Sequence, residues 1–387
     1  MNINKKNKII KSNIELLRIF AMIIIIAHHA TVHGVFKIKD VWKYENKINL
    51  LILKMFQWSG KISNALFFMI CGYFHIKKNK LNLNSIIWKT CFYGFLISII
   101  GKIAKFFKIN DFENENSYIK LNLLKFNPLT SGIYWFITVY IILIIFSLEL
   151  NKFLNKLNKL GYIIFLIFFY IIWYYISYYY GSGYFELKSS TFFYCIGGYL
   201  KLFPKKKKLF NLFIFLIIGI IGYIFSMELE FIKKLINLWA LKYVFYKNRY
   251  IYLIGIPLSS YGFFNFFNLL DIGNWKIINI FGKSCYAIYL IHDSYVLRII
   301  IWKYITKIQE KFIQENFPLN FTIIIFKVFF FCSLIEIFQQ NFIEFYALNY
   351  INKIIEFLKE KFILKYEEIT TIKENIEIEK LQLNTKI

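Results

Sequence analysis

The chain has 387 residues, of which 58% are hydrophobic, and its mean hydropathy is +0.49. Charged residues make up only 18% of it, against about a quarter in a typical soluble domain. The apolar residues fall in blocks about 18 or more residues long, which is the length that a helix needs to cross a lipid bilayer. This composition excludes a soluble enzyme, a disordered chain and a disulfide-stapled domain, and it predicts a polytopic membrane protein.

The net charge of +25 arises from 48 basic and 23 acidic residues. The lysines lie between the apolar blocks, as in KLFPKKKK at 201–208, and this distribution indicates solvated loops beside anionic lipid headgroups. Because the basic residues form no dense stripe, we expect membrane lipids and not nucleic acid as the partner of these charges. Arg18 and Arg298 lie inside apolar blocks, where a charged residue usually has a function.

The apolar blocks predict the spans in chain order. The first block begins after a basic stretch, as a signal peptide does, but Glu15 and Arg18 interrupt it and no clear cleavage site follows, so we expect a retained span. Continuous apolar runs favour helices, which satisfy their own backbone in lipid. We therefore predict an all-α bundle of about ten transmembrane helices within a membrane domain at 1–350, followed by a charged cytoplasmic tail at 351–387. The blocks lie near residues 14–35, 50–74, 85–107, 132–150, 160–180, 189–203, 209–227, 250–270, 283–302 and 318–347.

The loop charges predict an orientation in the cell membrane. Lysine-rich loops alternate with poorer ones such as the acidic DFENEN at 111–116, which by the positive-inside rule favours both termini in the cytoplasm. The segment 228–249 leaves two alternatives open, because it reads either as an interfacial helix or as an extra span that would reverse everything after it. The lysine-rich loops are KKNK at 77–80, NKFLNKLNK at 151–159 and KKKK at 205–208.

The first span contains Glu15, Arg18, His28, His29 and His33. Arg18 and His29 are eleven residues apart, which is three helical turns plus about 20°, so both side chains should project from one face about 16 Å apart. A guanidinium near the cytoplasmic mouth suits a phosphate-bearing group, and an imidazole deeper in suits a general base towards a hydroxyl. The alternative is that Arg18 reaches back to the headgroups and the histidines only end the helix.

A metal site is a third interpretation of these histidines. His29 and His33 have the i, i+4 spacing of a metal pair, but no carboxylate or thiolate ligand is near them in the sequence. The five cysteines are far apart and contain no C-x-x-C pair. We therefore expect no metal.

The polar pattern of the first span, ELLRIFAMIIIIAHHATVHG, resembles the opening helix of the acyltransferase-3 family of integral membrane acyltransferases, which has an Arg, ten residues and then a His. Four further blocks resemble that family in the right order, with Cys71 in place of a usual Ser. Together the five blocks cover residues 14 to about 340. The four blocks are FFMICGYF at 67–74, YWFITVY at 134–140, YCIGGYL at 194–200 and GKSCYAIYLIHDSYV at 282–296.

This resemblance implies transfer of an acyl group, usually acetyl from acetyl-CoA, to a hydroxyl of a cell-surface polysaccharide or of its lipid-linked glycan precursor. It implies that Arg18 and His29 are catalytic. The family often has an R-x-x-R pair after the second block, whereas here the stretch has lysines, so we expect Arg18, Lys78 and Lys89 to hold the CoA phosphates.

The later blocks offer candidates for the acceptor site. His292 follows Tyr289 within YLIH and precedes Asp293, which could orient its imidazole; it binds substrate or, as the alternative, organises helix packing. Trp135 and Tyr134 are interface or packing aromatics in one interpretation and a sugar-stacking surface in the other. We expect Trp135, Tyr289 and His292 to contact the acceptor.

Two further expectations concern Arg298 and the class of protein. Arg298 has the length to pair with Glu336 in the last span or with a lipid phosphate. The alternative to an enzyme is a transporter or flippase for a glycan precursor, with Arg18 and the histidines along its path. Transporters often have repeated halves, and no internal repeat is visible in the sequence, which favours the acyltransferase.

Overall fold

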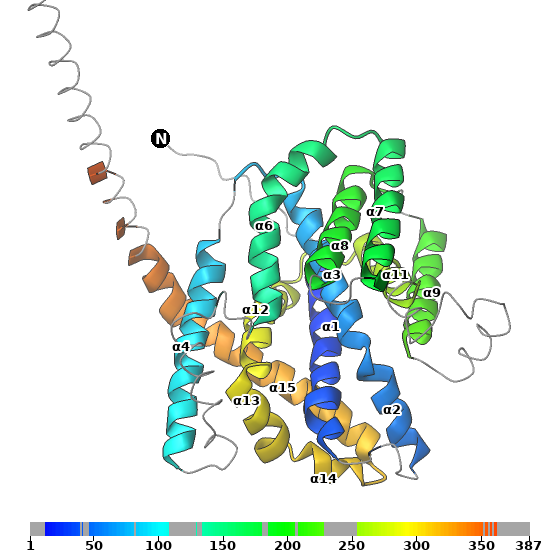
Figure 1. The fold of residues 1–387 in the computed structure, drawn as a ribbon. Helices are drawn as coiled ribbons and strands as arrows, with labels where there is room; N and C mark the ends of the chain where they lie inside the picture. Colours follow the sequence, from blue (N-terminus) through cyan, green and yellow to red (C-terminus); the bar gives the residue numbers. More distant parts are fainter. Residues whose placement is uncertain are drawn as a thin grey trace, which may run out of the picture.

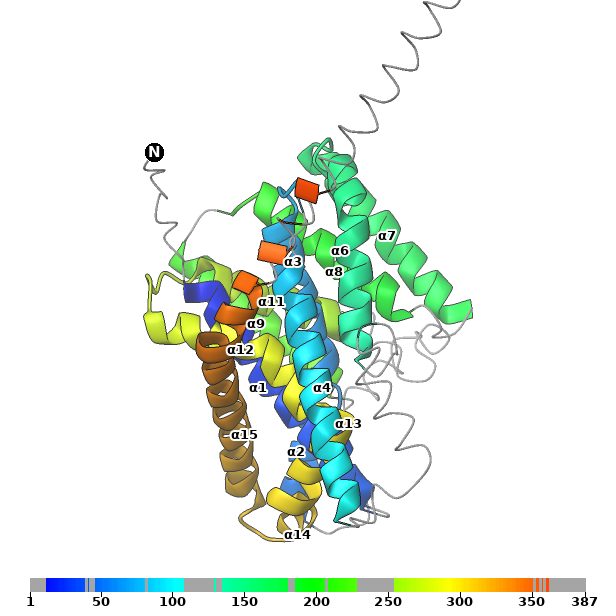
Figure 2. The same ribbon diagram turned by 90° about the vertical axis from the view of Figure 1, so that its left-hand side faces the viewer.

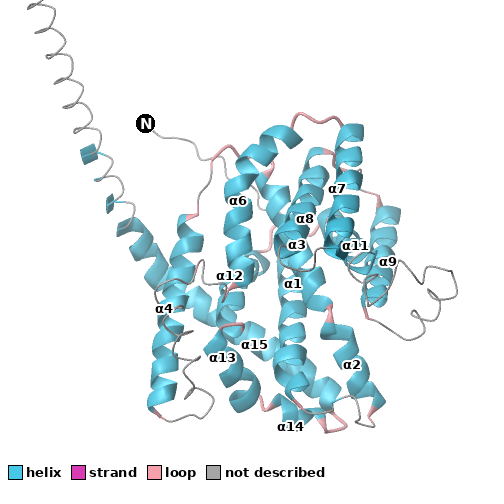
Figure 3. Cartoon of the chain, in the orientation of Figure 1, coloured by secondary structure: helices cyan, strands magenta, loops and turns pink. Residues whose placement is uncertain are grey.

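The structure is a computed structural model, and the parts of the chain that it describes are helical, with no strand among them (Figure 3). This confirms the all-α membrane bundle. The acidic loop at 111–116, the ambiguous segment at 228–249 and most of the tail after 350 lie outside the described residues. The described residues are 12–38, 41, 46–80, 83–107, 129, 134–179, 185–205, 208–227 and 254–350, with 353, 354, 357, 360 and 361.

Helices are labelled as in Figure 1. Most are about as long as the apolar blocks that predicted them, and π-helical turns follow α1, α13 and α15 at Ala30–Gly34, Ile300–Ile305 and Gln340–Glu344. The α-helices are α1 (Ser12–His29), α2 (Lys47–Gln57), α3 (Ser59–His75), α4 (Asn84–Phe106), α6 (Trp135–Leu154), α7 (Lys159–Tyr179), α8 (Phe185–Leu202), α9 (Leu209–Ser226), α11 (Ile256–Leu269), α12 (Lys276–His292), α13 (Tyr295–Ile299), α14 (Ile308–Phe312) and α15 (Phe317–Gln339).

Among the described residues, five helices are long and apolar enough to cross a membrane, and the number is six if a bent pair of helices counts as one span. The predicted number of ten spans is therefore not confirmed. The block at 50–74 divides at Trp58 into α2 and α3. The block at 283–302 contains the end of α12 and the helix that follows it, between which the chain bends by 79°. The five spans are Ser12–Lys37, Asn84–Phe106, Trp135–Leu154, Leu209–Ser226 and Phe317–Tyr350.

Helix α1 packs at the centre, in contact with α3, α11, α12 and α15. In both ribbon views α14 and the C-terminal end of α1 lie at one end of the bundle, and the turn at 155–158 between α6 and α7 lies at the other (Figures 1 and 2). Helix α1 has buried residues on several faces, as expected of a helix that other helices enclose. Its polar side chains must therefore find partners within the protein.

Helices α3 and α8 approach each other closely at two glycines. A Cβ at Gly72 would collide with the carbonyl of Tyr194, and a Cβ at Gly197 would collide with the carbonyl of Met69. Small residues allow membrane helices to pack backbone against backbone, where dispersion contacts replace the hydrophobic effect. This contact holds α3 firmly beside α8.

The bend after α12 positions the polar residues of the site. Helix α12 ends at His292, and the hydroxyl of Ser294 accepts a hydrogen bond from the backbone N–H of Leu297, which caps α13. The π-helical turn after α13 contacts the π-helical turn after α1. As a result, Asp293 and Arg298 face the histidines of the first span.

Candidate active site

A cavity of about 610 Å³ lies at the C-terminal end of α1, and we call it the histidine cavity. Five described helices other than α1 contribute residues to it, namely α3, α6, α8, α12 and α13, and the first three begin at its wall. Its polar and aromatic lining residues are His28, His29, His33, Lys61, Asn64, Trp135, Thr138, Glu186, Tyr289, Asp293 and Arg298.

The hydrogen bonds of His292 define the tautomer of His29. The Nδ1 of His292 lies 2.5 Å from the carbonyl oxygen of Ile288, and a carbonyl only accepts, so Nδ1 of His292 bears the proton. Its unprotonated Nε2 lies 3.0 Å from Nδ1 of His29 and accepts from it. The Nε2 of His29 is then the nitrogen with the free lone pair, and it has no hydrogen-bond partner among the described residues. We infer that His29 is arranged as a base.

Asp293 supplies the negative charge behind this base. Its Oδ1 lies 3.4 Å from Nδ1 of His29 and 3.7 Å from Nε2 of His33. Arg298 lies 3.3 Å from the same oxygen through Nε, and it donates from Nη2 to the backbone carbonyl of Asp293 at 2.9 Å and from Nη1 towards Nδ1 of His33 at 3.4 Å. An imidazolium formed at His29 would therefore face a carboxylate that Arg298 holds in place.

This arrangement corrects two expectations. The pairing of Arg298 with Glu336 is wrong, because the bend after α12 directs Arg298 to Asp293 and His33. A carboxylate does lie near the histidines, since ligand atoms of His29, His33 and Asp293 are all within 4.8 Å of one another. A divalent cation bound to Oδ1 of Asp293 would lie close to the positive charge of Arg298, which contacts the same oxygen, and the two charges would repel each other. This set of donors therefore suits proton transfer better than metal binding.

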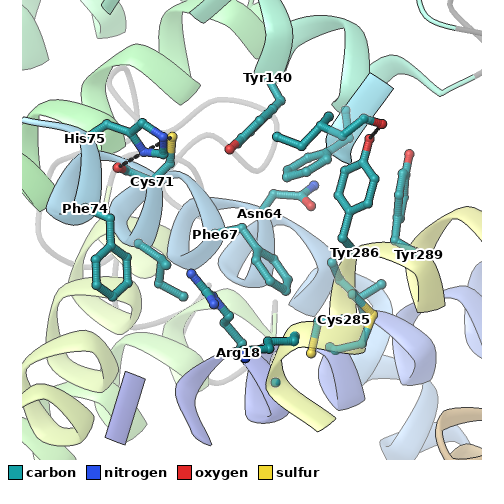
Figure 4. Close-up of a pocket in the computed structure, with 17 residues that line it drawn as sticks. Arg18, Asn64, Phe67, Cys71, Phe74, His75, Tyr140, Cys285, Tyr286 and Tyr289 are labelled. Carbon is teal, nitrogen blue, oxygen red and sulfur yellow. Dashed lines mark hydrogen bonds between the residues drawn. The ribbon is translucent and has the colours of Figure 1, made fainter. Parts of the chain in front are cut away.

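A second cavity, of about 200 Å³, lies beside Arg18, and we call it the arginine cavity (Figure 4). Glu15 binds Nη1 of Arg18 through both carboxylate oxygens, at 2.7 and 2.9 Å, and the guanidinium lies over the ring of Phe74 at 5.4 Å. The remaining N–H groups of Arg18 have no hydrogen-bond partner in the described part of the chain. They are available to a ligand anion.

One stripe of α1 connects the two cavities. Arg18, Met22 and Ile25 line the arginine cavity, and Ile25 and His29 line the histidine cavity. These residues follow one another at i, i+4, i+7 and i+11, which is a single helix face. Ile25, Asn64 and Tyr289 line both cavities, so the cavities adjoin there.

Lys78 lies at the edge of the arginine cavity, while Lys89 lies elsewhere. Lys78 is exposed and donates to Nε2 of His75 at 3.4 Å, and His75 lines the cavity. Lys89 is buried in an ion pair with Glu336 and lies 3.4 Å from Glu344, and it lines neither cavity. A buried lysine that is already paired has little charge to offer to a CoA phosphate.

Cys71 is the unusual residue of the second sequence block, and it lines the arginine cavity beside His75 (Figure 4). The Nδ1 of His75 donates to the carbonyl of Cys71 at 3.0 Å, and its Nε2 accepts from Lys78. Neither nitrogen of His75 is therefore available as a base for the thiol, which lies 3.8 Å away. Cys71 acts as a small packing residue here.

The structure brings two of the three residues expected to contact the acceptor to the histidine cavity. Trp135 and Tyr289 line it, whereas His292 is fully buried behind His29 and positions that imidazole. Tyr134 is buried and donates to the carbonyl of Leu290, so packing is its role.

Sequence reasoning missed Lys61, Asn64 and Glu186. The Nζ of Lys61 lies over the ring of Trp135 at 5.6 Å and 3.9 Å from a carboxylate oxygen of Glu186. A polar residue just before FFMICGYF at 67–74 was the available signal for Asn64. Lys61 and Asn64 have the i, i+3 spacing of one helix face, but Glu186 is more than a hundred residues away, so no spacing could have joined it to them.

The match to a known family agrees with this geometry. A family model described as an acyltransferase domain, that of acyltransferase-3, matches residues 11–337. The chain therefore belongs to the acyltransferase-3 family. Neither the curated proteins nor the solved structures that were compared contain a match to the chain. As an acyltransferase in a membrane-embedded bundle, it requires an acyl donor and an acceptor.

Proposed function

We propose that the protein transfers an acetyl group from acetyl-CoA to a hydroxyl of a cell-surface polysaccharide or of its lipid-linked glycan precursor. The observation that supports this most strongly is the pair of adjoining cavities, one beginning at Arg18 and the other containing the base His29. A transferase needs two substrates to meet, and Ile25, Asn64 and Tyr289 mark the place where they would meet.

The donor occupies the arginine cavity in this proposal. The free N–H groups of Arg18 bind phosphate oxygens, and Lys78 adds a positive charge at the edge. Apolar side chains such as Met22, Phe67 and Ile70 line the space beyond Arg18, and they suit the pantetheine arm. The thioester then reaches the junction of the cavities.

The acceptor occupies the histidine cavity. The indole of Trp135 offers a face for a sugar ring, and Lys61 and Glu186 offer a donor and an acceptor for its hydroxyls. These two charges have opposite sign and lie close together, so the rim favours a neutral, hydroxyl-rich acceptor over a highly charged one.

In the reaction, Nε2 of His29 takes the proton of the acceptor hydroxyl as its oxygen attacks the thioester carbon. The imidazolium keeps its Nδ1–H towards His292 and Asp293, which stabilise the added charge. When the C–S bond breaks, the departing thiolate takes the proton from His29, and an acetate ester and free CoA result. General base catalysis of this kind contributes about 10²–10⁴-fold to the rate.

The experiment that tests the proposal measures free thiol released from acetyl-CoA by the purified protein in liposomes. The reaction is run with and without a cell-envelope glycan extract, for the wild type and for His29→Ala, and thermal melting checks that the variant folds. Release that needs both the glycan and His29 supports the transferase. Movement of a glycan precursor across the liposome without thiol release would refute it and identify the transporter instead.

A further inference from the structure

The junction between the two cavities has a chemical feature beyond the base. Of the three residues that line both cavities, Ile25 is apolar, while Asn64 and Tyr289 each have a hydrogen-bond donor. Asn64 also lines a third, small cavity with Lys61 and Glu186. Figure 4 shows the Asn64 amide pointing into the arginine cavity between Phe67 and the tyrosines of the opposite wall.

The amide of Asn64 has no hydrogen-bond partner among the described residues. Asn64 is half-buried, so this amide is accessible from the cavity and free to bind a ligand. The side-chain amides of five other asparagines each donate to a nearby oxygen at 2.6–2.9 Å. These are Asn49, Asn151, Asn155, Asn265 and Asn279.

The hydroxyl of Tyr289 is buried and also has no partner in the part of the chain that the structure describes. Its neighbours differ from it, because Tyr134 donates to the carbonyl of Leu290 and Tyr286 shares a hydrogen bond of 2.6 Å with Thr90. A buried hydroxyl without a partner costs free energy that a ligand could recover. Both residues that line the two cavities and have a donor therefore have that donor unpaired among the described residues.

We propose that Asn64 and Tyr289 are catalytic residues that hold the oxyanion of the transfer reaction. The inference rests on the proposed function. When the acceptor oxygen bonds to the thioester carbon and its proton moves to His29, the carbonyl π electrons become a negative charge on oxygen. The Nδ2–H of Asn64 and the O–H of Tyr289 donate to that oxygen until the carbonyl reforms and the C–S bond breaks. Donors placed for this charge act mainly in the transition state.

The test compares the kinetics of Asn64→Leu, Asn64→Asp and Tyr289→Phe with those of the wild type, using acetyl-CoA and glycan extract. Asn64→Asp and Tyr289→Phe keep the shape of the replaced side chains. They therefore still test the role of each donor if Asn64→Leu does not fold. Loss of one oxyanion donor should lower kcat by about 10²–10³-fold with little change in the KM of either substrate. Tyr134→Phe is the matched control, because it removes a hydroxyl from a packed tyrosine outside both cavities.

The outcomes separate this inference from the proposed function. If the wild type is active and depends on His29, but Asn64→Asp and Tyr289→Phe keep kcat within about threefold, the oxyanion role is overturned and the transferase stands. A rise in KM with unchanged kcat also overturns it, since the donors would then bind the ground state. If the wild type releases no thiol, the proposed function fails and the oxyanion role fails with it.

Discussion

The buried ion pair between Lys89 and Glu336 predicts that Lys89 stabilises the fold and does not bind the acyl donor. Glu336 is 0% exposed and accepts from Lys89 at 2.5 Å, from Tyr93 at 2.6 Å and from Gln340 at 2.6 Å. Replacing Lys89 with Met keeps an unbranched side chain of nearly the same length and removes the ammonium group that donates to Glu336. Breaking a buried pair typically costs about 3–5 kcal/mol. Since two donors remain on Glu336, we expect the lower end, about 3 kcal/mol.

The assay is a double-mutant cycle on the free energy of unfolding in mixed detergent micelles. Lys89→Met is compared with Glu336→Gln and with the double variant, which removes both charges of the pair and leaves Glu344 without its contact to Lys89. We expect the double variant to lie within about 1–2 kcal/mol of the wild type, because removing both charges also removes their desolvation cost. The KM for acetyl-CoA should be the same in all four proteins. An increase of about tenfold or more in that KM for Lys89→Met, with unchanged unfolding, would refute the structural role and restore Lys89 to the donor site.

Two further predictions concern the base and the helix contacts. Asp293→Asn should lower kcat by about 10²–10⁴-fold, because the imidazolium of His29 loses its carboxylate, and steady-state thiol release measures this; near-normal turnover would contradict the role of Asp293. Gly197→Ala should destabilise the protein by about 1–3 kcal/mol, because the added Cβ would collide with the carbonyl of Met69. Gly161→Ala on α7 is the control and should not destabilise it, because the added Cβ would lie 3.2 Å from its nearest neighbour, the side-chain oxygen of Asn158. Melting curves compare the two, and equal stability would argue against close packing of α3 on α8.

The helical character of the chain and the face shared by Arg18 and His29 could be predicted from the sequence, because both follow from local periodicity. The partners of His29 could not. His292 and His29 are separated by 263 positions, and they meet because α12 packs along α1. Arg298 meets Asp293 and His33 because the chain bends after α12, where neither glycine nor proline marks a turn. Glu336, one of the two partners that the sequence suggests for Arg298, is occupied by Lys89 from another helix.

The number of spans shows a similar limit. Hydropathy joins α2 to α3 across Trp58, because the residues on both sides are apolar whether or not the helix is continuous. Asn64 shows the limit in the site itself. A single polar residue in an apolar block has no partner in the sequence that would suggest a role, and its meaning depends on two cavities that other helices complete.

The contact between α1 and the bend after α12 also has a consequence for biogenesis. The first span leaves the ribosome with its arginine and three histidines long before Asp293 and Arg298 have been synthesised, and ionisable groups raise the cost of insertion into lipid. Glu15 is close enough in the chain to neutralise Arg18 at once, since the two form an i, i+3 pair. The histidines have no acidic partner within the first span, so a carboxylate for their charged forms arrives only with Asp293. The proposed proton-transfer network is therefore completed only when the last third of the chain has been inserted, and an incompletely translated protein contains the proposed base without Asp293 beside it.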